Sequence, residues 1–565
     1  MGKKAKAKAK AKTKKKQDVS FIRLSAFSKN KWKKRGIILI FLFASLILLI
    51  HVHHFQFKHL IDDAYISFRY ADNFIHGNGL VYNEGERVEG YTNFLWVILL
   101  SGFMSVGLCP IKISKILGIL FSLLSLLTTF WISKEMAGNN RRKEDIYDFI
   151  PAVFLVYNSS YCVWTTGGLE THLFGFLLLL GILFYLKGIY NRKSNIYSSI
   201  FYVFACMSRP EGVLFVFISF IHRLISGIIK RNKIYLQDAF IFVGSFIILS
   251  LPYLLFKLWY YGEILPNTFY VKVVSGQEVF NAGKFYITEF VTQNFNILLL
   301  INFVILCTYN IKEFGVTYLM SLILPFCVYI FWIGGDFFPC FRFFVPILPL
   351  FCILIGTSFR IISHRFQKYK LLVYSFIVLT IGYSLYHSFN SSPRGTQSKD
   401  LVIKSNEVEK DRIDTGRWLA DRLPSSTSMA LNPAGIIPFY TRFYTIDMLG
   451  LNDKHIGRKK VGKLTSGALA HLKFDSDYVL SKNPDLIIIG ACELLKGKIS
   501  KERIIEYYQF IVNAIPGDRA LLENKRLFEE YDLMAAKIKD DKFLPLFVSK
   551  KKKGEIGNKF IPVLL

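Results

Sequence analysis

The chain has 565 residues, of which 52% are hydrophobic and 16% aromatic, and its formal net charge is +30. This composition is too apolar for a soluble protein of this length and indicates a polytopic membrane protein. Residues 1–35 hold fifteen Lys and Arg residues and one acid, which predicts a disordered basic tail on the cytoplasmic side. Nucleic-acid binding is the less favoured interpretation of this tail. The eight cysteines have no paired spacing, so neither a disulfide framework nor a zinc site is predicted.

Apolar runs of membrane-spanning length follow one another over residues 36–390. They occur near residues 36–54, 111–133, 148–164, 171–187, 195–207, 213–229, 239–258, 294–310, 315–333, 343–361 and 371–388. A further run, 92–108, is ambiguous. If it is a juxtamembrane or re-entrant helix and does not cross, every Lys/Arg-rich loop falls on the side of the N-terminus, as the positive-inside rule requires. We therefore predict a polytopic α-helical protein of the plasma (bacterial inner) membrane with about eleven spans, its N-terminus inside and its C-terminus outside.

The composition changes after residue 390. Residues 391–565 mix polar and apolar side chains and contain no run of spanning length. Residues 411–423 have the pattern of an amphipathic helix, and residues 485–490 have that of a buried strand. The segment is long enough to bury a core of its own. We predict a soluble α/β domain on the extracytoplasmic side.

The polar, motif-like segments fall on the outer face in this topology. The first outer loop, 56–110, has six acidic and three basic residues, the reverse of the inner loops. Two adjacent acids, Asp62 and Asp63, lie just after the first apolar run. A charge at that depth costs free energy and is usually retained for function. The pair can act as a general base, a metal ligand or a sensor of a charged head group, whereas helix capping is the purely structural alternative.

Other outer segments carry side chains that can bind ligands. Arg209, Lys272 and Arg342 are candidates for binding an anion such as a phosphate, and a structural Arg209–Glu211 pair is the alternative for the first. The candidates for contacting substrate or supporting the site are Arg69, Glu86, Glu89, Asn93, Glu170, Glu211, Asn267 and Asp336. Carboxylates that suit Mg²⁺ or Mn²⁺ occur at Asp62, Asp63, Glu170 and Asp336. We predict no required metal or other cofactor, with a divalent cation as the open alternative.

Together these segments resemble the integral-membrane glycosyltransferases of the GT-C class, and among them the terminal β-(1→2)-arabinofuranosyltransferases and their bacterial relatives. The matching segments are, in chain order, 62–71 (DDAYISFRYA), 85–96 (GERVEGYTNFLW), 168–171 (GLET), 209–212 (RPEG), 266–270 (PNTFY), 334–339 (GGDFFP) and 446–453 (IDMLGLND). Seven segments in order are more specific than any one alone. The lysine-rich tail is not a motif of the family, and the run after Asp336 is bulkier than in many relatives. The identity of the sugar is therefore not carried over.

The resemblance implies a reaction. A sugar is expected to pass from a polyprenyl-phosphate donor to an extracytoplasmic glycan or glycolipid acceptor, with inversion at the anomeric carbon. In the family an aspartate of the first outer loop is the general base, so Asp62 or Asp63 is expected to deprotonate the acceptor. We expect Arg209, Lys272 and Arg342 to stabilise the leaving lipid phosphate. A polytopic glycolipid transporter or flippase is the alternative, less favoured because no internal repeat is visible and the charged motifs share one face.

Overall fold

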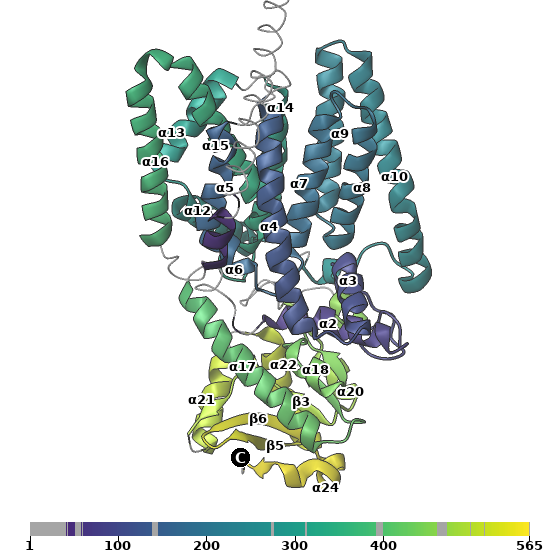
Figure 1. Cartoon of the computed structure of the whole chain (residues 1–565). Coiled ribbons are helices and arrows are strands. Elements are labelled where there is room, and N and C mark those ends of the chain that lie inside the picture. The colour runs from purple at the N-terminus through teal and green to yellow at the C-terminus, as the bar shows by residue number, and fades with distance from the viewer. Residues whose placement is uncertain are drawn as a thin grey trace, which may run out of the picture.

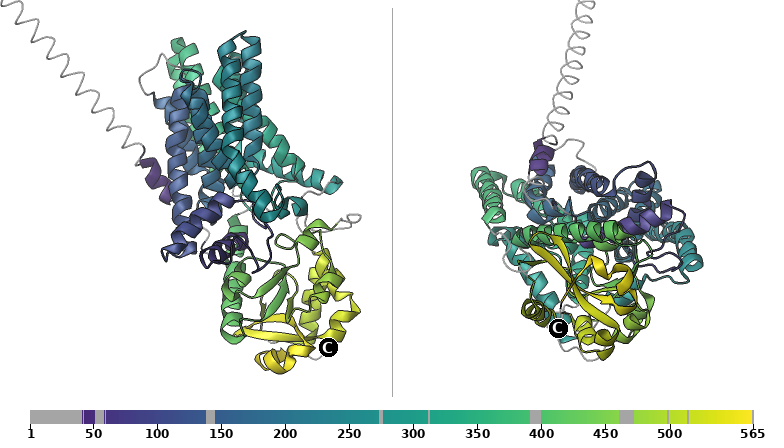
Figure 2. Two further views of the ribbon diagram at one scale, coloured as in Figure 1. Left: turned by 90° about the vertical axis from the view of Figure 1, so that its right-hand side faces the viewer. Right: turned by 90° about the horizontal axis from the view of Figure 1, so that it is seen from below.

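The computed structural model describes residues 41, 43–50, 58, 60–137, 145–272, 276–310, 313–390, 399–459, 472–497, 499–512 and 515–563. A helical bundle lies above a smaller domain built on a β-sheet (Figures 1 and 2). The predicted tail 1–35 and about half of the first predicted span lie outside the described residues.

The bundle follows the apolar runs of the sequence. Each predicted run from residue 111 onward lies in one helix or in adjoining helices. These elements are α4 (Pro110–Met136), α5 (Ile150–Tyr157), α6 (Ser159–Trp164), α7 (Thr171–Lys187), α8 (Lys193–Ser208), α9 (Gly212–Ile229), α10 (Lys233–Tyr261), α12 (Gln277–Asn294), α13 (Ile297–Asn310), α14 (Phe314–Trp332), η2 (Arg342–Ile347), α15 (Leu348–Arg365) and α16 (Lys370–Asn390). The short helix α11 (Asn267–Lys272) connects α10 to α12.

Helix length and composition support a multi-pass membrane protein. Within the described residues, five helical segments are long and apolar enough to cross a bilayer: α4, α9, α10, α14 and the continuous η2–α15 segment. The pair α12–α13 is bent by 98° and adds a sixth if it forms one span. Other helices, including α7, are apolar but shorter. The count of about eleven spans therefore stays a prediction.

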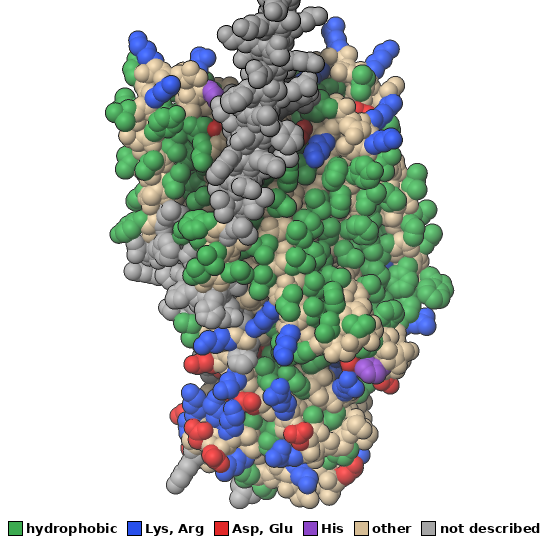
Figure 3. Space-filling model, viewed as in Figure 1, with side chains coloured by type: hydrophobic (Ala, Val, Ile, Leu, Met, Phe, Trp, Pro, Cys, Tyr) green, Lys and Arg blue, Asp and Glu red, His purple; other side chains and the backbone are tan. Residues whose placement is uncertain are grey.

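Exposed basic residues of the bundle gather at one of its ends. A belt of hydrophobic side chains separates two polar ends (Figure 3). Exposed basic residues lie at the end of the bundle away from the sheet domain, where α8 and α10 begin and α9 ends. Arg192, Lys193, Lys230, Arg231 and Lys233 belong to this group. This is the pattern expected of loops on the cytoplasmic side.

Two helices of the first outer loop lie between the bundle and the sheet domain (Figure 1). They are α2 (Asp62–Ile75) and α3 (Phe94–Ser105). With 12 residues, α3 is too short to cross a bilayer alone, which agrees with a surface position for the run 92–108. Asp62 and Asp63 form the first turn of α2, where the helix dipole favours negative charge. This arrangement holds both carboxylates at the junction of the two domains.

The C-terminal domain contains a mixed sheet with strand order β2-β1-β3-β6-β5-β7, in which β4 also pairs with β6. Strands β1 (Ser428–Leu431), β2 (Tyr444–Asp447) and β3 (Leu486–Ile488) are parallel, whereas β4 (Leu495–Lys496), β5 (Tyr531–Lys539), β6 (Lys542–Ser549) and β7 (Ile561–Pro562) pair in antiparallel fashion. The helices are α17 (Lys399–Arg422), α18 (Ile436–Thr441), α19 (Lys454–Arg458), α20 (Ser476–Ser481), α21 (Lys501–Val512), α22 (Pro516–Leu522), α23 (Lys525–Glu530) and α24 (Lys553–Ile556).

Both faces of this sheet are buried. Met429 and Leu431 of β1 pack in one core with Leu419 of α17, whereas the intervening Ala430 packs in a second core with Ile504 of α21. Alternation along a strand sends successive side chains to opposite faces, which explains the two cores. The strand predicted over 485–490 is β3, and the helix predicted over 411–423 forms the second half of α17.

Candidate active site

The two adjacent aspartates have different partners. Both oxygens of the Asp62 carboxylate accept hydrogen bonds from the sheet domain, from the backbone N–H groups of Gly435 and Ile436, each at 2.8 Å. The backbone N–H of Asp62 donates to Glu409 of α17 at 3.2 Å. Asp62 is only 8% exposed. Its carboxylate therefore joins α2 to the sheet domain.

Asp63 is half-buried and lies within electrostatic reach of two cations. Burial raises the pKa of Asp63 above its ordinary value of 3.8, and the carboxylates of Asp62 and Asp336 add to this rise. Lys272 and Arg342 oppose it, because positive charges favour the carboxylate form. A carboxyl group whose pKa is raised beside cationic groups is suited to accept a proton.

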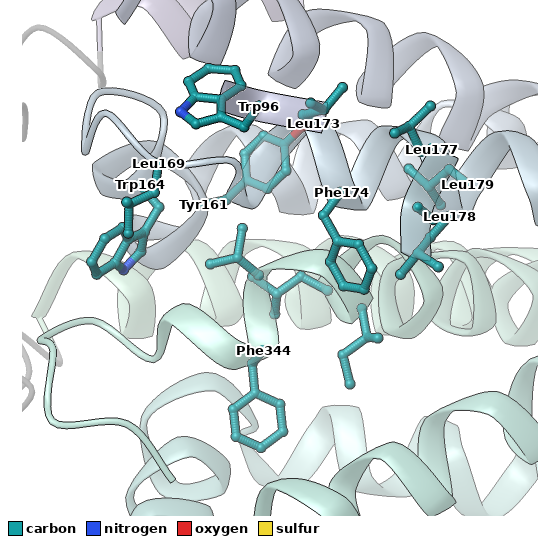
Figure 4. Close-up of a cluster of buried hydrophobic side chains, with 14 of the residues drawn as sticks. Trp96, Tyr161, Trp164, Leu169, Leu173, Phe174, Leu177, Leu178, Leu179 and Phe344 are labelled. Carbon is teal, nitrogen blue, oxygen red and sulfur yellow. The ribbon is translucent and has the colours of Figure 1, made fainter. Parts of the chain in front are cut away.

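Arg342 is held by a tightly constrained segment. Its Nε atom forms an ion pair with Asp336 at 2.6 Å, and both side chains are buried. The preceding residues Cys340 and Phe341 have left-handed φ angles of 60° and 47°, which non-glycine residues rarely adopt. The indole N–H of Trp164 donates to the carbonyl of Cys340 at 3.2 Å. This segment rests on the apolar cluster of α6, α7 and η2, where Trp164 lies with Leu169 and Phe344 (Figure 4).

Lys272 is the exposed cation of the group. It is the last residue of α11 and acts electrostatically on both Asp63 and Glu211. Within the described part of the chain it has no ion-pair partner. Its ammonium group is therefore available to an anionic ligand beside Asp63.

A second network crosses the outer ends of the bundle helices. Arg209 pairs with Glu170 at 3.0 Å and with Glu211 at 2.9 Å. Glu170 also accepts a hydrogen bond from the Asn93 amide at 2.8 Å, and that amide donates to Ser67 of α2 at 3.0 Å. The network links α2, the start of α3, the start of α7 and the end of α8. The structural Arg209–Glu211 pair is present, and two carboxylates balance the charge of Arg209.

Arg69 fastens α2 to the sheet domain. Its guanidinium donates to the carbonyls of Pro438 and Phe443 at 2.9 Å and 2.8 Å. It also donates to the Tyr82 carbonyl at 2.7 Å and to the Asn83 side chain at 3.0 Å. The guanidinium of Arg69 thus donates its hydrogen bonds to neutral acceptors of the protein itself. The structure therefore supports a structural role for Arg69 in place of the predicted contact with substrate.

Three further candidates also contact the protein itself. Glu86 accepts a hydrogen bond from a tyrosine hydroxyl of β2 at 2.6 Å. The Asn267 amide donates to three carbonyls of the loop 450–453 at 2.8–3.1 Å. Glu89 pairs with Lys257 at 2.9 Å, and burial raises the pKa of Glu89 to about 7. These contacts tie the first outer loop and α11 to the sheet domain and to α10, and the described residues show no contact between these side chains and Asp63.

Sequence reasoning missed the partners of Asp62. They are the amides of Gly435 and Ile436, and the side chain of Glu409, which pairs with Arg412 at 3.1 Å. A Pro- and Gly-containing turn between an apolar strand and an apolar helix, here 432–435, is a visible signal. No local pattern indicates that this turn meets a carboxylate far away in the chain.

The described residues contain no group of three His, Cys, Asp or Glu side chains placed to hold a metal ion. Three of the four carboxylates considered for a divalent cation have other partners in the structure. Asp62 accepts two amide hydrogen bonds, Glu170 pairs with Arg209, and Asp336 pairs with Arg342.

Comparison with known proteins identifies the fold. Residues 402–536 match a family described as a domain of unknown function, DUF8728. A terminal β-(1→2)-arabinofuranosyltransferase of Mycobacterium tuberculosis is 28% identical over 252 residues, which are 42% of this chain and 38% of that protein. ArnT of Cupriavidus metallidurans bound to undecaprenyl phosphate superposes with a TM-score of 0.50 at 11% identity, over 73% of this chain and 86% of that one.

The chain has the fold of the GT-C glycosyltransferases. The archaeal oligosaccharyltransferase AglB of Archaeoglobus fulgidus, in complex with an inhibitory peptide and a dolichol-phosphate, also shares it. AglB superposes with a TM-score of 0.54 at 12% identity, over 92% of this chain and 75% of that one. The resemblance drawn from the sequence motifs is thus confirmed. The match to the arabinofuranosyltransferase spans less than half of that relative's length.

Proposed function

We propose that this protein transfers a sugar from a polyprenyl-phosphate donor to a hydroxyl of an extracytoplasmic glycan or glycolipid, with inversion and with Asp63 as the general base. One observation carries the assignment of the base. The sheet domain occupies both oxygens of Asp62, whereas Asp63 is within electrostatic reach of Lys272 and Arg342. The lipid phosphates bound to ArnT and AglB support the donor class.

The proposed chemistry follows from charge and proton balance. Asp63 accepts the proton of the acceptor hydroxyl while the oxygen forms a bond to the anomeric carbon. The bond from that carbon to the phosphate oxygen breaks on the opposite side, and the lipid phosphate keeps the electron pair. The leaving group is a stable anion, so it needs stabilisation of charge more than an acid catalyst.

The three candidate cations have different parts in this proposal. Lys272 and Arg342 stabilise the departing phosphate from beside Asp63. Arg342 meets Asp336 through Nε, which leaves its Nη atoms for the phosphate. Arg209 acts mainly by fixing Glu170, Glu211 and the ends of α7 and α8, because its charge is already balanced.

A transfer assay tests the proposal directly. Purified protein in detergent or liposomes, given a radiolabelled polyprenyl-phosphate sugar and a cell-envelope acceptor, should form a product with inverted anomeric configuration. We expect EDTA to leave the rate unchanged, because Asp62, Glu170 and Asp336 already have hydrogen-bonding or ion-pair partners. A product that retains the anomeric configuration would contradict the mechanism. Loss of activity in EDTA would indicate that a divalent cation is required.

The acidic limb of the pH–rate profile should report Asp63. The base must be ionised, so activity falls as pH drops through its pKa, which burial places above 3.8. Lys272 lowers that pKa, so Lys272→Gln should move the limb of kcat/KM to higher pH. Lys284→Gln, at an exposed position on α12, is the matched control and should leave the limb in place. If Lys272→Gln leaves the acidic limb in place, Lys272 does not influence the pKa of the catalytic base.

We place the sheet domain outside the cytoplasm of a bacterial inner membrane, because the basic end of the bundle is the opposite one. Single cysteines at Lys230 and at Lys551, an exposed residue of the sheet domain, test this orientation in a variant that lacks native cysteines. An impermeant maleimide applied to intact spheroplasts should label position 551 and spare position 230. The reverse pattern would overturn the orientation.

A further inference from the structure

The sheet domain meets α2 at a distinctive point of its topology. From β1 the chain goes to β2 on one side and later returns to β3 on the other side of β1. The loop after β1 therefore lies at a switch point outside the carboxyl ends of parallel strands, where open α/β sheets usually bind ligands. Here the group received by this loop is Asp62 of the same chain.

The contact is close and leaves little freedom. A Cβ atom on Gly435 would lie 1.9 Å from the Asp62 carbonyl oxygen, so only glycine allows this approach. The Tyr82 hydroxyl donates to the carbonyl of Ala434 in the same loop at 2.6 Å. Arg412, 4.0 Å from Asp62, pairs with Glu409 and limits repulsion between the two carboxylates.

The switch point itself is closed by a buried carboxylate. Asp518 accepts hydrogen bonds from the Asn432 amide and from the Gly490 N–H, each at 2.9 Å. These two residues follow β1 and β3, so Asp518 ties the two loops together. The loop 432–435, which contacts Asp62, is therefore held in place by hydrogen bonds to the rest of the sheet domain.

We propose that the sheet domain sets the position of the catalytic base, with Asp62 as the positioning residue through which it acts. The inference rests on the proposed function of Asp63. Successive residues of a helix point about 100° apart, so holding Asp62 in the first turn of α2 also fixes the direction in which Asp63 leaves the helix. Asp63 is within electrostatic reach of Lys272 and Arg342. The domain is thus a working part of the active site rather than a separate acceptor-binding module.

Two substitutions release the contact in different ways. Asp62→Asn replaces one acceptor oxygen with an amide NH₂, which faces a backbone N–H donor. Gly435→Ala keeps the charge of Asp62 but forces the backbones apart. Both should lower kcat by about 10- to 100-fold, the effect of an ångström-scale displacement, while the KM for donor stays within about two-fold. Gly554→Ala is the control, because a Cβ there meets nothing within 4 Å.

The pH profile separates positioning from a general loss of structure. The charge of Asp62 raises the pKa of Asp63, so Asp62→Asn should also move the acidic limb of kcat to lower pH. If either variant fails to fold, Tyr82→Phe gives a milder release of the same loop and should lower kcat several-fold with the fold intact. Unchanged kcat in the folded variants would overturn the inference. If Asp63→Asn is also fully active, the proposed function itself has failed; if Asp63→Asn is inactive, only the positioning role is lost.

Discussion

Asp63→Asn is expected to reduce turnover by about 10²- to 10⁴-fold, the usual contribution of a positioned general base. Asparagine has nearly the same shape but cannot take the acceptor proton. Donor binding should persist, because Lys272 and Arg342 remain in place. Single-turnover transfer of a radiolabelled sugar measures the loss, and a donor-lipid binding assay checks that the site still forms.

Asp72→Asn is the matched control for that variant. Asp72 lies on the same helix and pairs with Arg442, whose side chain is 65% exposed, and such pairs contribute little to stability. Its turnover should stay near that of the unsubstituted protein. Equal turnover in Asp63→Asn and Asp72→Asn would remove Asp63 from the mechanism.

Arg209→Met is expected to destabilise the fold by about 3–5 kcal/mol, the range for breaking a buried ion pair and leaving a charge uncompensated. It would leave the carboxylates of Glu170 and Glu211 without their cation, near the ends of α7 and α8. The melting temperature of the purified protein in detergent, followed by circular dichroism, should fall accordingly. Adding Glu170→Gln and Glu211→Gln should recover part of the loss, because no unpaired charge then remains.

An exposed arginine supplies the comparison. Arg519 pairs with Glu523 on the sheet domain, and both side chains are more than half exposed, at 57% and 66%. Arg519→Met should change the melting temperature little. If Arg209→Met left stability intact and weakened only donor binding, Arg209 would be a direct phosphate ligand, as the sequence suggested.

The helical framework follows from local signals. A membrane span needs about 20 apolar residues, so the apolar runs between residues 111 and 388 by themselves predict the positions of the helices. From the distribution of lysine and arginine, the short run 92–108 is predicted to be a juxtamembrane or re-entrant helix that does not cross, and α3 is short enough for either. The strand β3 was likewise visible, because a short apolar run beside turn residues predicts a buried strand.

The sequence named the residues of the candidate site but did not distinguish their roles. The sequence named Arg209, Lys272 and Arg342 together as anion-binding candidates and offered a structural alternative, the pair with Glu211, only for Arg209. The structure gives Arg209 two carboxylates and Arg342 one, whereas Lys272 has no ion-pair partner among the described residues. These differences depend on Glu170 and Asp336, whose proximity to the cations no spacing rule predicts.

The sequence by itself determined the membrane class, the helical runs and the presence of two adjacent carboxylates after the first apolar run, because hydrophobicity and charge are properties of short stretches of sequence. Only the tertiary structure shows that both oxygens of Asp62 are engaged by the sheet domain, which is why we propose Asp63 as the base. Asp62 meets Gly435 across 373 positions of the chain, and Asp63 does not share that contact. Burial and packing bring such distant groups together. The long-range contact therefore gives Asp62 and Asp63 different environments, although they are adjacent and identical in the sequence.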